Sequence, residues 1–189
     1  MDKLDSNYRH QIYHAMYNGG LIVNYASKES PIYQRTIDED DRIVEILEGD
    51  DVLMKAGGIV TSKSYMIRIR LNNNADTLVN HVKSLLYNKA VSVSSSGWAI
   101  DVGPRGIDKG FALKTLQDLV PKLADKKLAK LGDKGGINGN DYSLLRNECS
   151  FSVDEISSSI NSCFPIIHKD GEILKGVSAT EYFLQNLNI

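Results

Sequence analysis

The sequence predicts an α/β protein in which a small antiparallel sheet with helices is followed by helices and strands in alternation. Up to residue 102, short strand-like runs are joined by short turns, which is typical of antiparallel pairing. After Gly103-Pro104, helical and strand-like segments alternate, which favours a parallel sheet. With 189 residues, of which 42% are hydrophobic and 24% charged, the chain can bury the core of one domain or of two small ones.

The first quarter of the chain predicts a weak helix, a hairpin and an amphipathic helix. Residues 5–18 are polar and rich in Tyr and His, which favours only a weak helix. The apolar run 20–25 (GLIVNY) and the segment 32–36 flank the loop SKESP, so the two predict a hairpin. In 40–47 the apolar side chains share one helical face, and acidic residues open the segment, where the helix dipole stabilises negative charge.

The middle of the chain predicts a sheet covered by two helices. Residues 65–71 (YMIRIRL) alternate apolar and charged side chains, the period of a strand with one face in water. A capped helix over 74–87 buries a stripe of Leu and Val. Two strands, at 90–94 and 98–102, are joined by a turn that contains glycine.

The last part of the chain predicts four helices and two strands. The helices are expected at 109–119, 140–146, 154–161 and 178–187, and the strands at 128–131 and 150–153. Ser178 and Glu181 have the spacing of a capping box at the start of the last helix.

Charge and composition narrow the class of protein. A formal net charge of −2 provides no basic field for a phosphate backbone, which argues against nucleic acid as a partner. The two cysteines, Cys149 and Cys163, are too few for a disulfide framework and lack the spacing of a zinc site, so a reduced compartment fits best. No apolar run approaches the ~20 residues of a membrane span, and the first residues carry no apolar signal segment, so a cytoplasmic protein is expected.

A Gly-rich loop carries the strongest chemical signal. In KLGDKGGINGND an apolar strand ends at Gly132-Asp133 and a loop leads to Asn140-Asp141. Carboxylates at the carboxyl end of a parallel strand face the crevice where α/β proteins bind ligands, and two carboxylates with an amide oxygen suit Mg²⁺. The glycines let the loop bend back so that the two carboxylates converge. The alternative is a surface turn in which Asp133 ends a strand and Asn140 caps a helix.

A lysine at a helix start is the second signal. In DVGPRGIDKGFALKTL a strand is followed by Asp108-Lys109-Gly110 and a helix. The positive end of a helix dipole repels an ammonium group, so an anion such as a phosphoryl group could offset the cost of Lys109. The alternative is a solvated lysine beside Asp108.

Together, these two segments resemble the third and fourth motifs of haloacid-dehalogenase-type phosphatases with a large cap. Residues 17–22 (YNGGLI) resemble the Asn-Gly strand that opens the sheet-like cap of the sugar-phosphate phosphatases in this superfamily. The resemblance covers about residues 17–189. It implies a partial Rossmannoid core with a parallel sheet and an α+β cap with an antiparallel sheet. The expected divisions are a segment that joins the core at 1–19, the cap at 20–102, and the C-terminal half of the core at 103–189.

The resemblance also implies roles for individual residues. Lys109 would be the motif-three lysine, Asp133 the principal magnesium ligand, and Asn140 and Asp141 its supporting motif. Most such phosphatases have two residues between Gly-Asp and Asn-Asp, whereas six stand here, so GDKGGINGND looks closer to the eukaryotic-type phosphomannomutases of the superfamily.

The sequence departs from the family pattern at the nucleophile. The family reaction needs a strand that ends in Asp-x-Asp, and no residue before Tyr17 supplies it. Asp38-Glu39-Asp40 has the spacing but neither the apolar strand before it nor the turn after it, so it is interpreted as the start of the 40–47 helix.

Three arginines are candidate substrate ligands. Arg68 and Arg70 share one strand face and could bind a phosphate or carboxylate, although such arginines are often simply solvated. Arg105, next to the lysine motif, could bind an anion or serve the turn. Trp98 is expected to pack on the sheet rather than to stack on a sugar.

Two functions are therefore expected. The first is a Mg²⁺-dependent phosphohydrolase or phosphomutase acting on a small phosphorylated metabolite, a sugar phosphate above all. The second is a catalytically inactive module, truncated or split, that serves binding or assembly and forms a homo-oligomer or takes a strand from a complementing chain.

Overall fold

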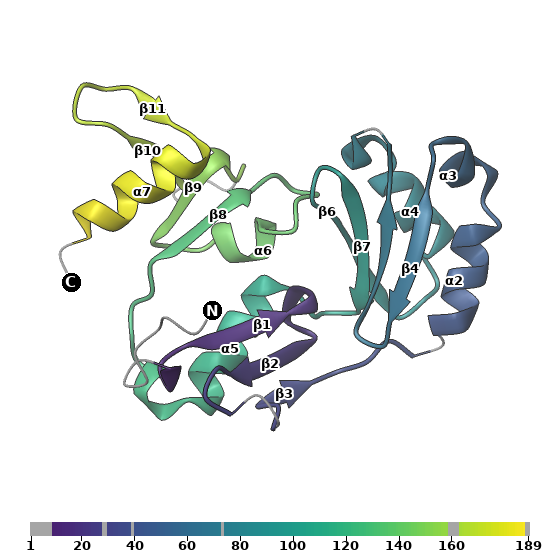
Figure 1. Cartoon of the computed structure of the whole chain (residues 1–189), viewed down its shortest axis with the longest axis horizontal. Helices are drawn as coiled ribbons and strands as arrows, with labels where there is room; N and C mark the ends of the chain where they lie inside the picture. Colours follow the sequence, from purple (N-terminus) through teal and green to yellow (C-terminus); the bar gives the residue numbers. More distant parts are fainter. Residues whose placement is uncertain (1–8, 28–29, 39, 73, 159–162, 188–189) are drawn as a thin grey trace. The chain divides into compact units, whose positions relative to one another are not determined.

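The computed structural model describes residues 9–27, 30–38, 40–72, 74–158 and 163–187 (Figure 1). The chain divides into two compact units, Met1–Ala124 and Asp125–Ile189. The mixed α/β fold class is confirmed, with antiparallel sheets in the first unit and a largely parallel sheet in the second. The predicted joining of residues 1–19 and 103–189 into one core stays a prediction.

The first unit begins with a small antiparallel sheet in the order β1-β2-β3. Its strands are β1 (Tyr13–Met16), β2 (Leu21–Asn24) and β3 (Tyr33–Gln34), with the turn η1 (Tyr17–Gly19) between the first two. Pairing of β2 with β3 confirms the predicted hairpin. The weak helix expected over 5–18 is wrong at residues 13–16, where pairing with β2 outweighs local propensity, and residues 5–8 of that prediction lie outside the described residues.

Helix α5 (Lys109–Leu119) packs on this small sheet and has the predicted bounds. The ring of Phe111 lies 5.3 Å from that of Tyr33. Gly19 of η1 fits tightly against the helix start, because a Cβ there would lie 2.9 Å from both the Asp108 carbonyl oxygen and the Ala112 Cβ. The turn η3 (Pro121–Leu123) follows the helix.

The second sheet of the first unit is antiparallel, in the order β4-β5-β7-β6, as predicted for the middle of the chain. Its strands are β4 (Ile59–Lys63), β5 (Met66–Arg70), β6 (Val91–Ser95) and β7 (Ala99–Pro104). One face forms a single apolar core with α2 (Asp40–Glu48), α3 (Asp51–Lys55) and α4 (Val79–Leu85). Ile67, Ile69 and Ile100 point into this core and are fully buried, so Arg68 and Arg70 lie on the opposite face.

The sequence patterns missed β4 and α3, and they predicted one helix where the structure has two pieces. Residues 75–77 form the 3₁₀ turn η2 (Ala75–Thr77), whose cap is Asn74, and α4 begins only after Leu78. Trp98 is 73% exposed, so the expectation that it packs on the sheet is wrong, because it stands in the turn between β6 and β7.

The second unit contains a sheet in the order β11-β10-β9-β8. The strands are β8 (Lys130–Lys134), β9 (Ser150–Glu155), β10 (Phe164–Ile167) and β11 (Ile173–Leu174). Parallel pairing of β8 with β9 confirms the predicted parallel sheet. The sequence patterns missed β10, which is parallel to β9, and β11, which is antiparallel to β10. Helix α7 (Gly176–Asn186) packs on Val153 and Ile166 through Ala179, and the short helix α6 (Tyr142–Leu145) contributes the fully buried Leu145.

Two predictions in this unit are wrong. The helix expected over 154–161 is replaced at its start by the end of β9, because Glu155 pairs with Lys134, while residues 159–162 lie outside the described residues. Ser178 does not cap α7: the helix already begins at Gly176, and the Ser178 hydroxyl donates to the Lys175 carbonyl oxygen at 2.9 Å. Among the described residues no helix has the length and apolar character of a membrane span.

Candidate functional site

The Gly-rich loop folds back over the end of β8. The Asp141 N–H donates to the Lys134 carbonyl oxygen at 3.1 Å, and the Gly135 N–H donates to the Glu155 carbonyl oxygen at 2.9 Å. Glycine is required at position 139, since a Cβ there would lie 2.2 Å from the Lys134 carbonyl oxygen. The loop thereby returns Asn140 and Asp141 to the strand end that carries Asp133.

Three predicted metal ligands, Asp133, Asn140 and Asp141, thus belong to one strand end, and they differ in environment. Asp133 is exposed and stands at an irregularity in the pairing of β8 with β9. Asp141 is only 3% exposed, and its Oδ2 accepts the N–H groups of Asp133 at 2.9 Å and of Lys134 at 3.2 Å. The exposed carboxylate can reach a ligand, whereas the buried one is already bonded to the backbone.

The donor chemistry of this loop fits magnesium. The Asn140 Oδ1 atom is buried and has no hydrogen-bond partner among the described residues, which is costly for a carbonyl oxygen unless a cation or donor reaches it. The described residues contain no group of three His, Cys, Asp or Glu side chains placed to hold a metal. Mg²⁺ needs no such group, because it binds through one or two carboxylates and keeps several waters.

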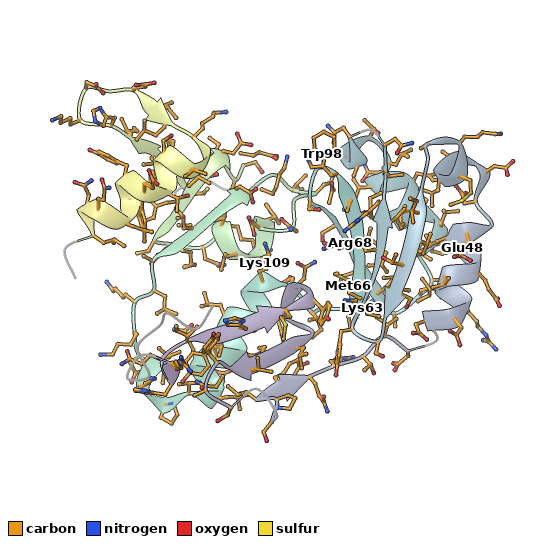
Figure 2. All side chains as sticks on the ribbon, in the orientation of Figure 1. Glu48, Lys63, Met66, Arg68, Trp98 and Lys109 are labelled. Carbon is orange, nitrogen blue, oxygen red and sulfur yellow. The ribbon has the colours of Figure 1, made fainter. Side chains whose placement is uncertain are left out.

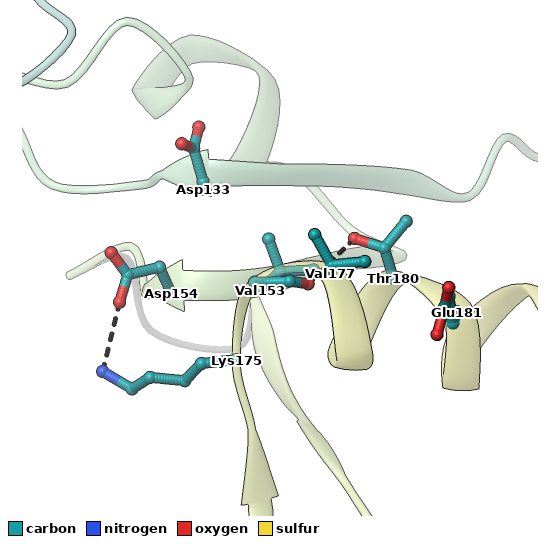
Figure 3. A pocket seen from close by; sticks show the side chains of 8 residues that line it. Asp133, Val153, Asp154, Lys175, Val177, Thr180 and Glu181 are labelled. Atoms are coloured by element: carbon teal, nitrogen blue, oxygen red, sulfur yellow. Dashed lines mark hydrogen bonds and ion pairs between the residues drawn. The ribbon is translucent and has the colours of Figure 1, made fainter.

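An open pocket of about 620 Å³ in the second unit is lined in part by Asp133 (Figure 3). Its other charged residues are Asp154, Lys175 and Glu181. Lys175 Nζ lies 3.1 Å from Asp154 Oδ1, and in Figure 3 the Asp133 side chain points away from that ion pair. Three carboxylates against one ammonium group repel a free phosphate, so an anionic ligand here requires a cation.

Lys109 is the first residue of α5, as predicted (Figure 2). The Asp108 side chain caps the helix by accepting the Phe111 N–H at 2.8 Å, and the helix has no acidic residue in its first turn. Lys109 belongs to the first unit and Asp133 to the second, so a pocket shared by the two stays a prediction.

Of the three candidate arginines, Arg68 forms an ion pair inside the protein. Its Nε donates to Asp101 Oδ1 at 2.7 Å, and its Nη2 donates to Asp101 Oδ2 at 3.1 Å. The hydrogen bonds and the charge of Asp101 raise the pKa of Arg68 despite partial burial. Arg70, on the same face, is exposed.

Arg105 lies after β7 and is exposed. Its Nη2 donates to the Lys89 carbonyl oxygen, which ties the turn to the segment before β6. The structure therefore gives this arginine a bond to the turn, while its predicted role toward substrate stays a prediction.

Comparison with known proteins gives structural matches only. No protein-family model matches the sequence, and no curated protein matches it. A sugar phosphatase of HAD subclass IIB superposes with a TM-score of 0.52 at 12% identity, over 77% of this chain and 65% of that one. An IMP-nucleotidase from Plasmodium falciparum has a TM-score of 0.54 at 18% identity, over 82% of this chain and 49% of that one. A HAD/COF-like hydrolase from Plasmodium vivax has a TM-score of 0.57 at 15% identity, over 75% of this chain and 61% of that one.

This chain has the fold of the haloacid-dehalogenase (HAD) superfamily. The HAD fold confirms the predicted combination of a Rossmannoid core and an α+β cap. The chain spans 65% of the length of the sugar phosphatase and about half of the IMP-nucleotidase.

Sequence reasoning missed two residues that matter in this HAD fold. Asp101 was not singled out, although its side chain is 1% exposed and pairs with Arg68. Glu155 was placed in a helix, although it lies against the Gly-rich loop and its carboxylate is 3.5 Å from Lys134 Nζ. Alternation in β5 and β7 could have suggested the Arg68–Asp101 pair, but the register of the two strands was needed to find it.

Proposed function

We propose that this chain serves a Mg²⁺-dependent phosphohydrolase or phosphomutase of the HAD type. The observation that carries the proposal is the loop after β8, which gathers Asp133, Asn140 and Asp141 and leaves the buried Asn140 Oδ1 without a partner among the described residues. An exposed carboxylate at one end of the loop and an unsatisfied amide oxygen at the other favour a hard cation over a neutral ligand.

The residues have distinct proposed roles. Asp133 and Asn140 would hold Mg²⁺, which when bound neutralises the oxygens of a phosphoryl group. Lys109 would place its ammonium group against the negative charge that builds on those oxygens during transfer. That anion would also offset the repulsion between Lys109 and the positive end of α5.

For the substrate we propose a small phosphorylated metabolite, with a sugar phosphate as the first candidate. The structural neighbours include a sugar phosphatase and an IMP-nucleotidase. In this chain the sheet face turned away from α2 and α4 carries Thr61, Ser92 and Ser94 beside Arg68 and Arg70, as the strand register implies. Hydroxyl and guanidinium groups suit the hydroxyls and phosphate of such a ligand.

The direct test is metal and phosphate binding by the purified chain. We expect titration calorimetry to detect Mg²⁺ binding, and inorganic phosphate to bind only when Mg²⁺ is present. Asp133→Asn should lower the affinity for Mg²⁺ at least about tenfold, because it removes the exposed carboxylate of the loop. Asp154→Asn is the matched control, since Asp154 belongs to the neighbouring strand β9 and lines the same pocket.

Turnover of p-nitrophenyl phosphate, with and without EDTA, extends the test to catalysis. Metal-dependent turnover that disappears in Asp133→Asn would support the phosphotransfer function. Wild-type protein that binds no Mg²⁺, or Asp133→Asn that binds it as well as wild type, would contradict the proposal.

A second candidate function is a binding or assembly module. In the described residues β8 is an edge strand of its sheet, and the backbone groups of an edge strand can pair with another strand. A protein without turnover that light scattering finds as a dimer or in complex with another chain would favour this function.

A further inference from the structure

Asp141 is the best-anchored side chain of the Gly-rich loop. It is 3% exposed, and one carboxylate oxygen, Oδ2, accepts the N–H groups of two consecutive residues, Asp133 and Lys134. Hydrogen bonds from N–H groups to a carboxylate are stronger than those to a neutral acceptor. This oxygen therefore fixes the backbone at the end of β8.

Gly132 makes room for that carboxylate. A Cβ at position 132 would lie 2.7 Å from Asp141 Oδ2 and 3.2 Å from Asp141 Cβ. The first distance is shorter than carbon and oxygen atoms tolerate without displacement. The side chain of Asp141 thus lies against the backbone of residues 132–134, in the space that a Cβ at position 132 would take.

The backbone of Asp141 joins the same strand end to α6. Its N–H donates to the Lys134 carbonyl oxygen, and its own carbonyl oxygen accepts the N–H groups of Leu144 at 3.0 Å and Leu145 at 2.8 Å. Leu145 is fully buried. Hydrogen bonds therefore join Asp141 both to the end of β8 and to α6.

We infer that Asp141 is a positioning residue, whose Oδ2 holds the backbone of Asp133 instead of binding the metal. The inference rests on the proposed function, because Asp133 is proposed there to hold Mg²⁺. Moving Oδ2 to a cation would leave the N–H groups of Asp133 and Lys134 without this acceptor, which is unfavourable. The sequence had suggested instead that both carboxylates support the metal directly.

Three variants separate anchoring from metal binding. Asp141→Ala removes the acceptor, Asp141→Asn keeps an oxygen acceptor without charge, and Asp133→Asn alters the exposed carboxylate alone. The measurements are the amide proton shifts of residues 133 and 134 in EDTA, the melting temperature in EDTA, and the Mg²⁺ affinity by calorimetry.

If Asp141 is a positioning residue, Asp141→Ala should move both amide signals upfield and lower the melting temperature in EDTA. It should also lower the affinity for Mg²⁺ by about 10–100-fold. Asp141→Asn should recover most of the melting temperature and of the affinity, because its amide oxygen can still accept from the backbone. Asp133→Asn should lose Mg²⁺ binding and keep the hydrogen bond from the Lys134 N–H to Asp141 Oδ2.

The inference is overturned if Asp141→Asn loses Mg²⁺ as completely as Asp133→Asn while keeping its melting temperature, or if the two amide signals do not move in Asp141→Ala. Should Asp141→Ala fail to fold, Gly132→Ala replaces it, since the added methyl group displaces the carboxylate and should shift the same amides. A wild-type chain that binds no Mg²⁺ would end the proposed function, and the amide signals in EDTA would still decide whether Asp141 anchors the strand end.

Discussion

Asp101 is a buried carboxylate whose charge is balanced by one side chain. It lies on the face of its sheet opposite the apolar core, and both of its oxygens accept from Arg68 across the β5–β7 pair. A side chain with 1% exposure that keeps two charge-assisted bonds depends on its partner more than a surface carboxylate does. We therefore regard Arg68 first as the partner of Asp101.

Removing Arg68 should destabilise the protein. We expect Arg68→Ala to lower the free energy of unfolding by about 1–3 kcal/mol, because it leaves a buried carboxylate without its donors. Arg68→Lys should recover only part of the lost free energy of unfolding, since an ammonium group cannot form the paired hydrogen bonds of a guanidinium. Urea unfolding measures both, and the double variant Arg68→Ala/Asp101→Ala should be less destabilised than Arg68→Ala alone. Equal stability of Arg68→Ala and wild type would mean that the pair is solvated.

At the scale of elements, Asp50 links two helices. Its side chain caps α3 by accepting the Leu53 N–H at 2.9 Å, and Oδ1 lies 3.0 Å from His81 Nε2 of α4. Burial pulls the pKa of Asp50 upward, but the bonds from Leu53 and His81 and the charge of His81 outweigh it and hold the pKa below its ordinary value of 3.8. The ionised form is thus the one that the folded protein favours.

This contact predicts a pH-dependent stability. Because the folded pKa is lowered, the contribution of Asp50 is present above about pH 4 and is lost as the pH falls through the folded value. Asp50→Ala should cost about 1 kcal/mol at pH 7, as for other lost helix caps. Urea unfolding between pH 7 and pH 3 should show the two proteins converging at the acid end. A difference that stays constant over this range would contradict the prediction.

The elements show what local patterns can and cannot predict. Alternation in 65–71 predicted β5, because the local period matches the buried face of the strand. The helix expected at 109–119 is α5. The strand β1 was missed because its order comes from pairing with β2. The end of β9 was taken for a helix because its pairing with the irregular end of β8 cannot be seen in a local pattern.

For the candidate site too, the sequence pattern predicts some features and misses others. The Gly-rich loop after an apolar strand singled out Asp133, Asn140 and Asp141 as candidates, and the family resemblance supplied their expected roles. They could not distinguish an exposed carboxylate from a buried one. That distinction depends on the missing Cβ of Gly132 and on which backbone N–H groups the loop brings to Asp141.

At the scale of the whole molecule, the proposed function requires Lys109 and Asp133 to act on one phosphoryl group. This requirement predicts that Mn²⁺, used in place of Mg²⁺, broadens the side-chain NMR signals of Lys109. Lys55, exposed on α3, is the control and should keep sharp signals. Asp133→Asn should abolish the broadening. If Lys109 behaves like Lys55 while Mn²⁺ is bound, the lysine takes no part in the site.

Gly19 has a consequence for how the protein tolerates change. Its φ of 105° disfavours any side chain at position 19, and a Cβ there would lie 2.9 Å from the carbonyl oxygen of Asp108, the residue that precedes α5. In a scan of every single substitution, position 19 should therefore be as intolerant as a reacting residue. Its role would be structural: by packing closely against the start of α5, Gly19 would fix the position of the Lys109 backbone.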